Sequence, residues 1–178
     1  MRKPNLTPDD LARAIRNVPD FPQPGIQFKD ITPLLADPEL FAGAVDLLTA
    51  DVVPGSVDSV VGIDARGFIF ASAAALKLKA GFVPIRKKGK LPYKTFEQSY
   101  ALEYGDSTVA IHVDALQPGS RVLLVDDLLA TGGTAAAAAA LVKKIGAEIV
   151  EITFLIELGF LKGRDKLRGF PVRSLIVY

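Results

Sequence analysis

The sequence predicts an α/β protein whose central β-sheet is mainly parallel and flanked by helices. Two observations carry this prediction: short apolar runs typical of buried parallel strands, and alanine- and leucine-rich helical segments that alternate with them. With 178 residues, the chain is long enough for one full hydrophobic core. Because neither an internal repeat nor an interdomain linker is visible, we expect a single domain over residues 1–178.

Two helices and a long connection are expected before residue 49. Thr7 caps the first helix, whose apolar spacing continues as far as Val18, and Pro19 ends it. Residues 19–36 contain four prolines and predict an irregular connection, of a length that is often functional. The second helix follows from residue 37 and has one apolar face: Leu40, Phe41, Ala44, Val45 and Leu48.

Strands and helices alternate over the rest of the chain. Buried strands are expected at residues 59–63, 81–85, 121–125, 150–156 and 174–177, with helices near residues 69–78 and 134–145. Ser107–Val113 predicts a further strand at the edge of the sheet. Residues 91–108 show no helical pattern, and we expect them to form a loop or lid.

The most informative segment begins with the buried strand at residues 121–125. Two carboxylates follow it, Asp126 and Asp127, and then five small residues precede a helix: Ala130, Thr131, Gly132, Gly133 and Thr134. The free amides and the positive dipole end at the start of that helix favour a phosphate. The acidic pair suits sugar hydroxyls or a divalent cation. The segment therefore predicts a pocket for a ribose 5-phosphate.

Other nucleotide motifs fit this segment poorly. The phosphate-binding loop of nucleoside triphosphatases needs a lysine directly after its glycines, and no lysine follows Gly133. A dinucleotide fingerprint places its acidic residue after the glycines, whereas Asp126 and Asp127 come before them. A simple strand-to-helix turn with a solvated acidic pair remains the alternative, although such a turn needs fewer polar residues.

Two further segments that suit anions follow other predicted strands. Residues 64–67 offer the amide of Ala65 and the guanidinium of Arg66, and residues 86–90 are a basic run. Because the carboxyl ends of parallel strands share one edge of a sheet, both segments should meet residues 130–134. They predict a ligand with two separated phosphate groups. Three side chains of the basic run would neutralise a diphosphate: Arg86, Lys87 and Lys90. The alternatives are a surface ion pair for the arginine of the first segment and a solvated face for the lysines.

Composition excludes several classes of function. A net charge of +1 provides no general field for nucleic acid or membranes, so we expect neither as a partner. The absence of cysteine excludes disulfides, thiolate metal sites and cysteine nucleophiles. No apolar stretch approaches the length of a membrane span, and the first residues have no apolar signal segment, so we expect a cytoplasmic protein.

Residues 122–134 resemble the phosphoribosyl-diphosphate (PRPP) motif of the type I phosphoribosyltransferases, and the wider sequence resembles their adenine-specific branch. The resemblance runs from about Asp20 to the C-terminus, through residues 20–31, 64–68, 85–92, 99–105 and 157–164. It implies the type I phosphoribosyltransferase fold, with a small N-terminal base-binding hood in residues 1–36 and a flexible lid at residues 91–108. It also implies a cis peptide between Asp64 and Ala65.

The resemblance further implies an enzyme of purine salvage, a Mg²⁺-dependent glycosyltransferase that converts adenine and PRPP to AMP and diphosphate. Asp126 and Asp127 would then hold the ribose, and residues 130–134 the 5′-phosphate. Mg²⁺ would be held mainly by substrate and water rather than by a dedicated protein site. A homodimer is implied as well.

The resemblance also assigns the chemistry of the base. Glu103 and Tyr104 become the catalytic residues of the lid, the first placing a proton near N7 and the second excluding water. Four residues are expected around adenine: Gln27, Phe28, Lys29 and Leu128. Two alternatives stay open: a PRPP-sensing regulator without catalysis, and a phosphoribosyltransferase for hypoxanthine or guanine. The first would need a further binding surface, and the second a different lid.

Overall fold

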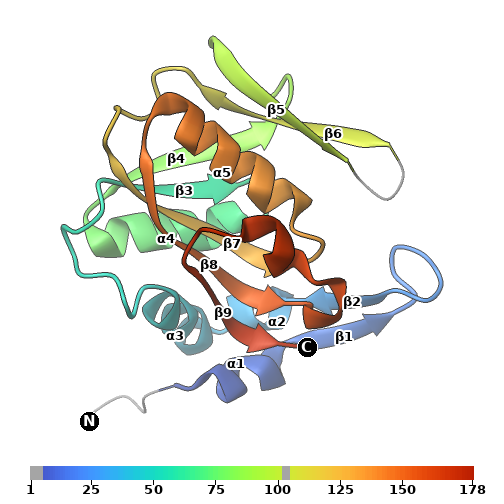
Figure 1. The fold of residues 1–178 in the computed structure, drawn as a ribbon. Coiled ribbons are helices and arrows are strands. Elements are labelled where there is room, and N and C mark those ends of the chain that lie inside the picture. Colours follow the sequence, from blue (N-terminus) through green and yellow to red (C-terminus); the bar gives the residue numbers. More distant parts are fainter. Residues whose placement is uncertain (1–5, 102–104) are drawn as a thin grey trace. The chain divides into compact units, whose positions relative to one another are not determined.

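The computed structural model describes residues 6–101 and 105–178 (Figure 1). The chain forms two compact units, Met1–Leu48 and Thr49–Tyr178. The expectation of one domain over residues 1–178 remains a prediction, because two compact units can belong to one domain. No helix in the described part of the chain has both the length and the apolar character needed to cross a membrane.

The first unit consists of three short helices and a two-stranded sheet. Helices α1 (Pro8–Ala14), α2 (Thr32–Ala36) and α3 (Pro38–Leu48) bury Leu11, Leu34 and Leu48. Thr7 caps α1 as predicted: it accepts a hydrogen bond from the Asp10 amide, and the Asp10 carboxylate accepts one in return from the Thr7 amide. Strands β1 (Arg16–Pro19) and β2 (Gln27–Asp30) pair antiparallel.

Two predictions for this unit are wrong. The first helix ends at Ala14, and the residues up to Pro19 form strand β1 instead of a further helical turn. The connection at residues 19–36 is irregular only in part, because it contains β2 and α2. The pairing of β1 with β2, a contact between distant residues, decides the conformation of both strands, whereas α2 is a short helix that has a proline in its first turn.

The second unit contains a seven-stranded sheet with the order β5-β6-β4-β3-β7-β8-β9 (Figure 1). Its strands are β3 (Ser59–Ile63), β4 (Gly81–Lys87), β5 (Thr95–Ala101), β6 (Asp106–His112), β7 (Arg121–Leu129), β8 (Glu148–Glu157) and β9 (Val172–Val177). The five neighbours from β4 to β9 are parallel, and β5 and β6 are antiparallel additions beside β4. The predicted mainly parallel sheet is confirmed.

Two helices cover opposite faces of this sheet. Gly62 of β3 faces Ala71 of helix α4 (Gly67–Leu78), whereas its neighbours Val61 and Ile63 belong to the core beneath helix α5 (Gly133–Ile145). Because successive strand residues point to opposite faces, the two helices lie on opposite sides. The alanines of α5 are mostly buried, and these small side chains allow the helix to lie close to the sheet.

The region predicted as a loop or lid is partly a hairpin. Thr95–Ala101 forms strand β5, which pairs with β6 along its whole length, so the prediction of a loop is wrong for these residues. The strand expected at Ser107–Val113 exists as β6, but it lies between β5 and β4 and is not the edge strand. Two short 3₁₀ helices, η1 (Gly159–Leu161) and η2 (Gly163–Leu167), were not predicted.

Candidate active site

The small residues after β7 form the predicted phosphate loop (residues 130–134) at the start of helix α5. Gly132 is the N-cap of this helix in a left-handed conformation (φ 79°), and no side chain caps the first turn. The loop encloses a cavity of about 80 Å³, which is also lined by Asp126, Leu128 and Leu129 of β7. Uncapped amides around a cavity of this size suit one tetrahedral anion.

The phosphate loop rests against η2. A side chain on Gly132 would overlap the backbone of Gly163, and one on Gly163 would overlap the carbonyl oxygen of Ala130. Arg164, the next residue, shares its one Nε proton between the two oxygens of the buried Glu157 carboxylate (2.8 and 2.9 Å), and its Nη1 donates to the Val172 carbonyl (2.9 Å). These bonds hold the turn that carries Gly163 against β8 and β9.

The two predicted ribose-binding carboxylates lie within β7, which continues to Leu129 and does not end before them. The Asp127 amide donates to Asp126 Oδ1 (2.9 Å). Removal from water and the neighbouring Asp127 carboxylate raise the pKa of Asp126 well above its usual range. Burial also raises the pKa of Asp127, and the charge of Arg66 opposes that shift.

Arg66 lies beside the acidic pair. Its Nη2 atom is 2.8 Å from Asp127 Oδ2, and the Asp127 side chain is only 8% exposed. The two side chains form an ion pair, but their geometry does not meet the criteria for a hydrogen bond. Asp127 Oδ2 is buried and accepts no hydrogen bond within the described residues. Gly67 follows directly, and a side chain there would lie 2.5 Å from Asp126 Oδ1. The start of α4 is thus fitted closely to the acidic pair.

The predicted diphosphate segments are brought together. The peptide between Asp64 and Ala65 is cis, as the resemblance implied. Arg86 Nε donates to Asp64 Oδ2 (3.2 Å), and its Nη1 donates to the carbonyl oxygen of Lys90 (3.2 Å). Arg86 therefore joins the loop after β3 to the basic turn after β4. Lys87 and Lys90 are exposed beside it.

The predicted base-site residues are distributed over both units. In the first unit, Phe28 lies on β2, with its ring edge-to-face with Phe21 at 5.1 Å between centroids. Lys29 Nζ donates to Asn17 Oδ1 (2.6 Å), and Gln27 is exposed. In the second unit, Leu128 lies on β7 and lines the phosphate-loop cavity. Glu103 and Tyr104 lie outside the described residues.

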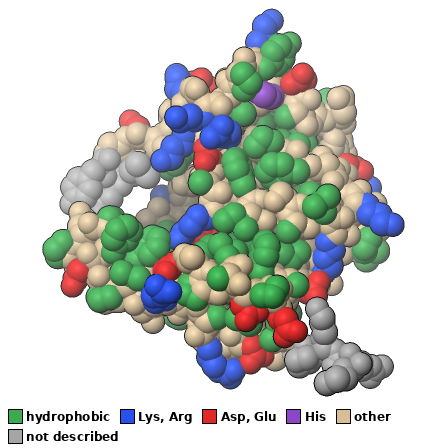
Figure 2. All heavy atoms as spheres, turned by 180° about the vertical axis from the view of Figure 1, so that it is seen from behind, with side chains coloured by type: hydrophobic (Ala, Val, Ile, Leu, Met, Phe, Trp, Pro, Cys, Tyr) green, Lys and Arg blue, Asp and Glu red, His purple; other side chains and the backbone are tan. Residues whose placement is uncertain are grey.

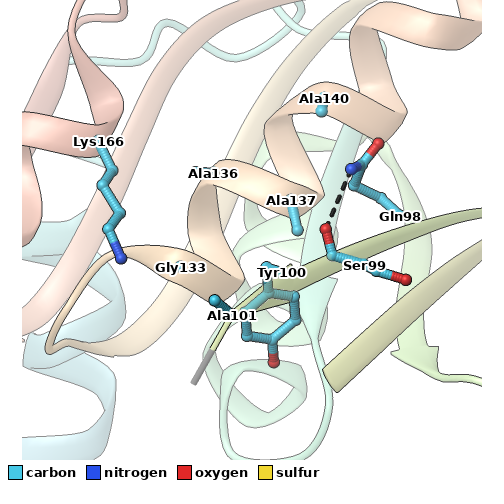
Figure 3. Close-up of a pocket in the computed structure, with 9 residues that line it drawn as sticks. All are labelled: Gln98, Ser99, Tyr100, Ala101, Gly133, Ala136, Ala137, Ala140 and Lys166. Atoms are coloured by element: carbon cyan, nitrogen blue, oxygen red, sulfur yellow. Dashed lines mark hydrogen bonds between the residues drawn. The ribbon is translucent and has the colours of Figure 1, made fainter. Parts of the chain in front are cut away.

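A second cavity, of about 320 Å³, was not predicted. It lies between the end of β5 and the first turns of α5, and Figure 3 shows the Lys166 side chain reaching toward Gly133 at one side of it. Tyr100 lines this cavity, and its hydroxyl is 3.0 Å from Thr134 Oγ1 of the phosphate loop. No local sequence pattern predicts this contact, and Tyr100 enters the sequence analysis only as part of residues 99–105.

The acidic pair is the only predicted place for a cation. Among residues 6–101 and 105–178, no group of three or more His, Cys, Asp or Glu side chains could hold a metal ion. The buried Asp127 Oδ2, which accepts no hydrogen bond from a described residue, is nevertheless an oxygen donor of the kind that Mg²⁺ prefers. The residues therefore fit a Mg²⁺ that takes most of its ligands from substrate and water.

Charge on the surface is mixed. On the face seen in Figure 2, Lys and Arg side chains form one small group and otherwise stand among apolar and acidic side chains. This distribution agrees with the net charge of +1 and with a local anion site.

Comparison with known proteins identifies the family. The model of the phosphoribosyl transferase domain matches residues 39–169. An adenine phosphoribosyltransferase of Acidothermus cellulolyticus is 61% identical over 166 residues, covering 93% of this chain and 94% of that protein.

Two crystal structures have the same fold. Adenine phosphoribosyltransferase from Rhodothermus marinus is 52% identical, with a TM-score of 0.92 over 96% of this chain and 98% of that chain. The Saccharomyces cerevisiae enzyme, complexed with an imino-altritol bisphosphate and adenine, is 43% identical, with a TM-score of 0.90 over 94% of this chain and 98% of that chain. Together with the phosphate loop and the acidic pair on β7, these matches show that the chain belongs to the adenine phosphoribosyltransferases, within the phosphoribosyl transferase domain family.

Proposed function

We propose that the protein transfers the 5-phosphoribosyl group of PRPP to N9 of adenine, giving AMP and diphosphate in purine salvage. Membership of the adenine phosphoribosyltransferase family supports this reaction. The observation that carries it is the convergence of three anion-binding segments, after β3, β4 and β7, at the carboxyl edge of parallel strands. Such an edge suits a ligand with phosphate groups at both ends of a sugar.

The phosphate loop would hold the 5′-phosphate through its uncapped amides and the hydroxyls of Thr131 and Thr134. Asp126 and Asp127 would accept hydrogen bonds from the ribose 2′- and 3′-hydroxyls. Positive charge develops on the sugar as the bond from C1′ to diphosphate breaks, and nearby carboxylates stabilise that charge.

The diphosphate would lie beside the Ala65 amide and the side chains of Arg66, Arg86, Lys87 and Lys90. Binding would require Arg66 to exchange its contact with Asp127 for one with diphosphate, which frees Asp127 for the ribose. Mg²⁺, which the proposal includes, would neutralise diphosphate oxygens and so make the diphosphate a better leaving group. Asp126 and Asp127 are the residues that would contribute oxygens to it, directly or through water.

The base-site assignments rest on the resemblance. Phe28 would stack on the adenine ring, with Gln27, Lys29 and Leu128 around the base. Glu103 would help to place a proton on N7 as N9 attacks C1′. Tyr104 would exclude water from the reacting carbon, which protects PRPP from hydrolysis.

The proposal also covers the oligomeric state of the protein and its place in the cell. We infer a cytoplasmic homodimer that binds adenine, PRPP, AMP and diphosphate, and neither nucleic acid nor membranes. Ile69, Leu76 and Phe82 are exposed on α4 and β4 and could be covered in a dimer. Light scattering after size exclusion checks the dimer, and a mass equal to one chain would contradict it.

The test of the reaction is a spectrophotometric assay with PRPP, Mg²⁺ and each of adenine, hypoxanthine and guanine. We expect turnover with adenine alone. Turnover of an oxopurine would preserve the PRPP site but overturn the base-site assignments. PRPP binding without any turnover would favour a PRPP-sensing regulator.

A further inference from the structure

Tyr100 connects strand β5 to the phosphate loop. It is the penultimate residue of the strand, and its partly buried hydroxyl lies 3.0 Å from Thr134 Oγ1. A Cβ atom on Gly133 would lie 3.0 Å from Tyr100 Cδ2, so the ring lies directly against the first residue of α5. Figure 3 shows Tyr100 beside Gly133 at the start of this helix. The contact thus joins residues that are 34 positions apart in sequence.

In the structure, Thr134 Oγ1 donates this hydrogen bond to the Tyr100 hydroxyl, and a phosphate bound in the loop would reverse its direction. A threonine hydroxyl has one proton and two lone pairs, and so does a tyrosine hydroxyl. A phosphate dianion in the loop only accepts, so Thr134 must give its proton to the phosphate. Tyr100 must then donate to Thr134 Oγ1. In this arrangement, the tyrosine orients the threonine hydroxyl toward the ligand and strengthens it as a donor.

The loop has few side-chain donors, because apart from its backbone amides only the hydroxyls of Thr131 and Thr134 can donate to a phosphate. Gly132 offers no side-chain cap, and the turn from Gly133 continues with alanines at residues 135–140. In the first turn of α5, Thr134 therefore contributes the single side-chain hydroxyl. The Tyr100 hydroxyl lies within hydrogen-bond distance of Thr134 Oγ1, so it can accept the threonine proton in the free protein and donate to Oγ1 once a phosphate takes that proton.

We infer that Tyr100 is a positioning residue for the 5′-phosphate, acting through the hydroxyl of Thr134. The inference rests on the proposed function, because it assigns the phosphate loop to the 5′-phosphate of PRPP and AMP. Tyr100 does not touch the reacting atoms in this account. Its contribution is to the affinity for ligands that carry a 5′-phosphate, and it leaves the affinity for diphosphate unchanged.

The experiment measures binding by calorimetry for the wild type, Tyr100→Phe, Thr134→Val and the double variant. Three probes are used: AMP, ribose 5-phosphate and inorganic diphosphate. We expect Tyr100→Phe to weaken AMP and ribose 5-phosphate about 3- to 10-fold, the range for one neutral hydrogen bond, and to leave diphosphate within about two-fold. Thr134→Val should remove the effect of the tyrosine hydroxyl, so that the double variant binds like Thr134→Val alone.

Tyr93→Phe is the matched control. Tyr93 is 56% exposed, and its ring contacts His112 away from the loop, so the loss of its hydroxyl should change none of the three affinities. Equal weakening of diphosphate and AMP by Tyr100→Phe would show a general structural role and overturn the inference. Additive effects of the two substitutions, or no effect of Tyr100→Phe, would also overturn it.

The binding test of Tyr100 does not depend on whether the proposed reaction is observed. Ribose 5-phosphate binding can be measured even if the wild type turns over no purine, so a failed assay leaves the test of Tyr100 in place. If the wild type binds neither ribose 5-phosphate nor AMP, the phosphate-loop assignment and the role of Tyr100 both fail.

Discussion

Gly132 and Gly163 meet backbone to backbone, although they are 31 positions apart in the sequence, and neither position has room for a Cβ atom. One belongs to the loop assigned to the 5′-phosphate, and the other begins η2. The ion pair between Arg164 and Glu157 holds η2 in place (2.8 Å). The shape of the phosphate loop is therefore set partly by a turn that touches no ligand in the proposed mechanism.

The first prediction concerns this contact. Gly163→Ala should push the phosphate loop away from η2, because the new methyl group would overlap the Ala130 carbonyl oxygen. We expect a loss of about 1–3 kcal/mol in the free energy of unfolding and at least ten-fold weaker AMP binding. Thermal unfolding and calorimetry measure the two effects. Gly81→Ala is the control, because its Cβ would meet Ser59 Oγ at an ordinary 3.4 Å. Wild-type AMP affinity in Gly163→Ala would contradict the prediction.

The second prediction concerns Asp127. Asp127→Asn should weaken PRPP binding about 10- to 100-fold, because a charged acceptor for a ribose hydroxyl becomes a neutral one. Titration of PRPP in the presence of Mg²⁺ measures the change. Asp165→Asn removes a carboxylate that is 59% exposed and pairs with Arg168 at the surface, and it should leave the affinity unaltered. An unchanged PRPP titration for Asp127→Asn would remove this residue from the ribose site.

The third prediction is a pH dependence of stability. Because burial raises the pKa of Asp126, the folded protein binds a proton there more tightly than the unfolded chain does. The free energy of unfolding therefore falls as pH rises from the ordinary pKa of 3.8 toward the raised value, and the loss is complete above it. Asp126→Asn should raise the melting temperature of the ligand-free protein at neutral pH and lose that advantage in acid.

Asp58→Asn provides a control of opposite sign. Hydrogen bonds from Arg121 hold the pKa of Asp58 below its usual value, so ionised Asp58 stabilises the fold at neutral pH. That stabilisation is lost as pH falls through the folded pKa. Asp58→Asn should therefore lower the melting temperature at neutral pH and have less effect in acid. If both variants shift the melting temperature in the same direction, the assignment of a raised pKa to Asp126 is wrong.

The fourth prediction concerns catalysis by the lid. Glu103→Ala should lower kcat at least ten-fold, because a positioned proton donor typically contributes a factor of about 100 or more. PRPP affinity should hardly change, since the glutamate is assigned to the base. Glu97→Ala is the control: this carboxylate pairs with Lys88 (2.8 Å) in a surface contact of small expected value. An unchanged kcat would remove Glu103 from the mechanism.

The apolar strands and the phosphate motif are the features that the sequence predicts best. Parallel strands are buried on both faces, so residues 60–63 of β3 and 122–125 of β7 appear as unbroken apolar runs whatever their neighbours are. The phosphate loop is equally local, because an anion site needs small residues directly before a helix. The phosphate loop lies at the same edge of the sheet as Arg66 and Arg86 because the strands that precede these residues are parallel.

Strands β1 and β5 could not be predicted in the same way. Thr95–Ala101 is mostly half-buried and carries no clear alternation of apolar and polar residues. Its conformation depends on pairing with β6 and on contact with α5, both of which join residues far apart in the chain. The residues before Pro19 have helical spacing, but their pairing with β2 outweighs that local preference.

The parallel α/β sheet, the phosphate loop, the acidic pair and the family are all predictable from local sequence, because each depends on residues that are adjacent in the chain or on strand direction. The contacts that support the site emerge from the folded chain: Gly163 lies behind Gly132, Tyr100 contacts Thr134, and Arg66 pairs with Asp127. These contacts join residues 31, 34 and 61 positions apart. No local sequence pattern predicts these three contacts, because the residues meet only after the sheet has brought its strand ends together.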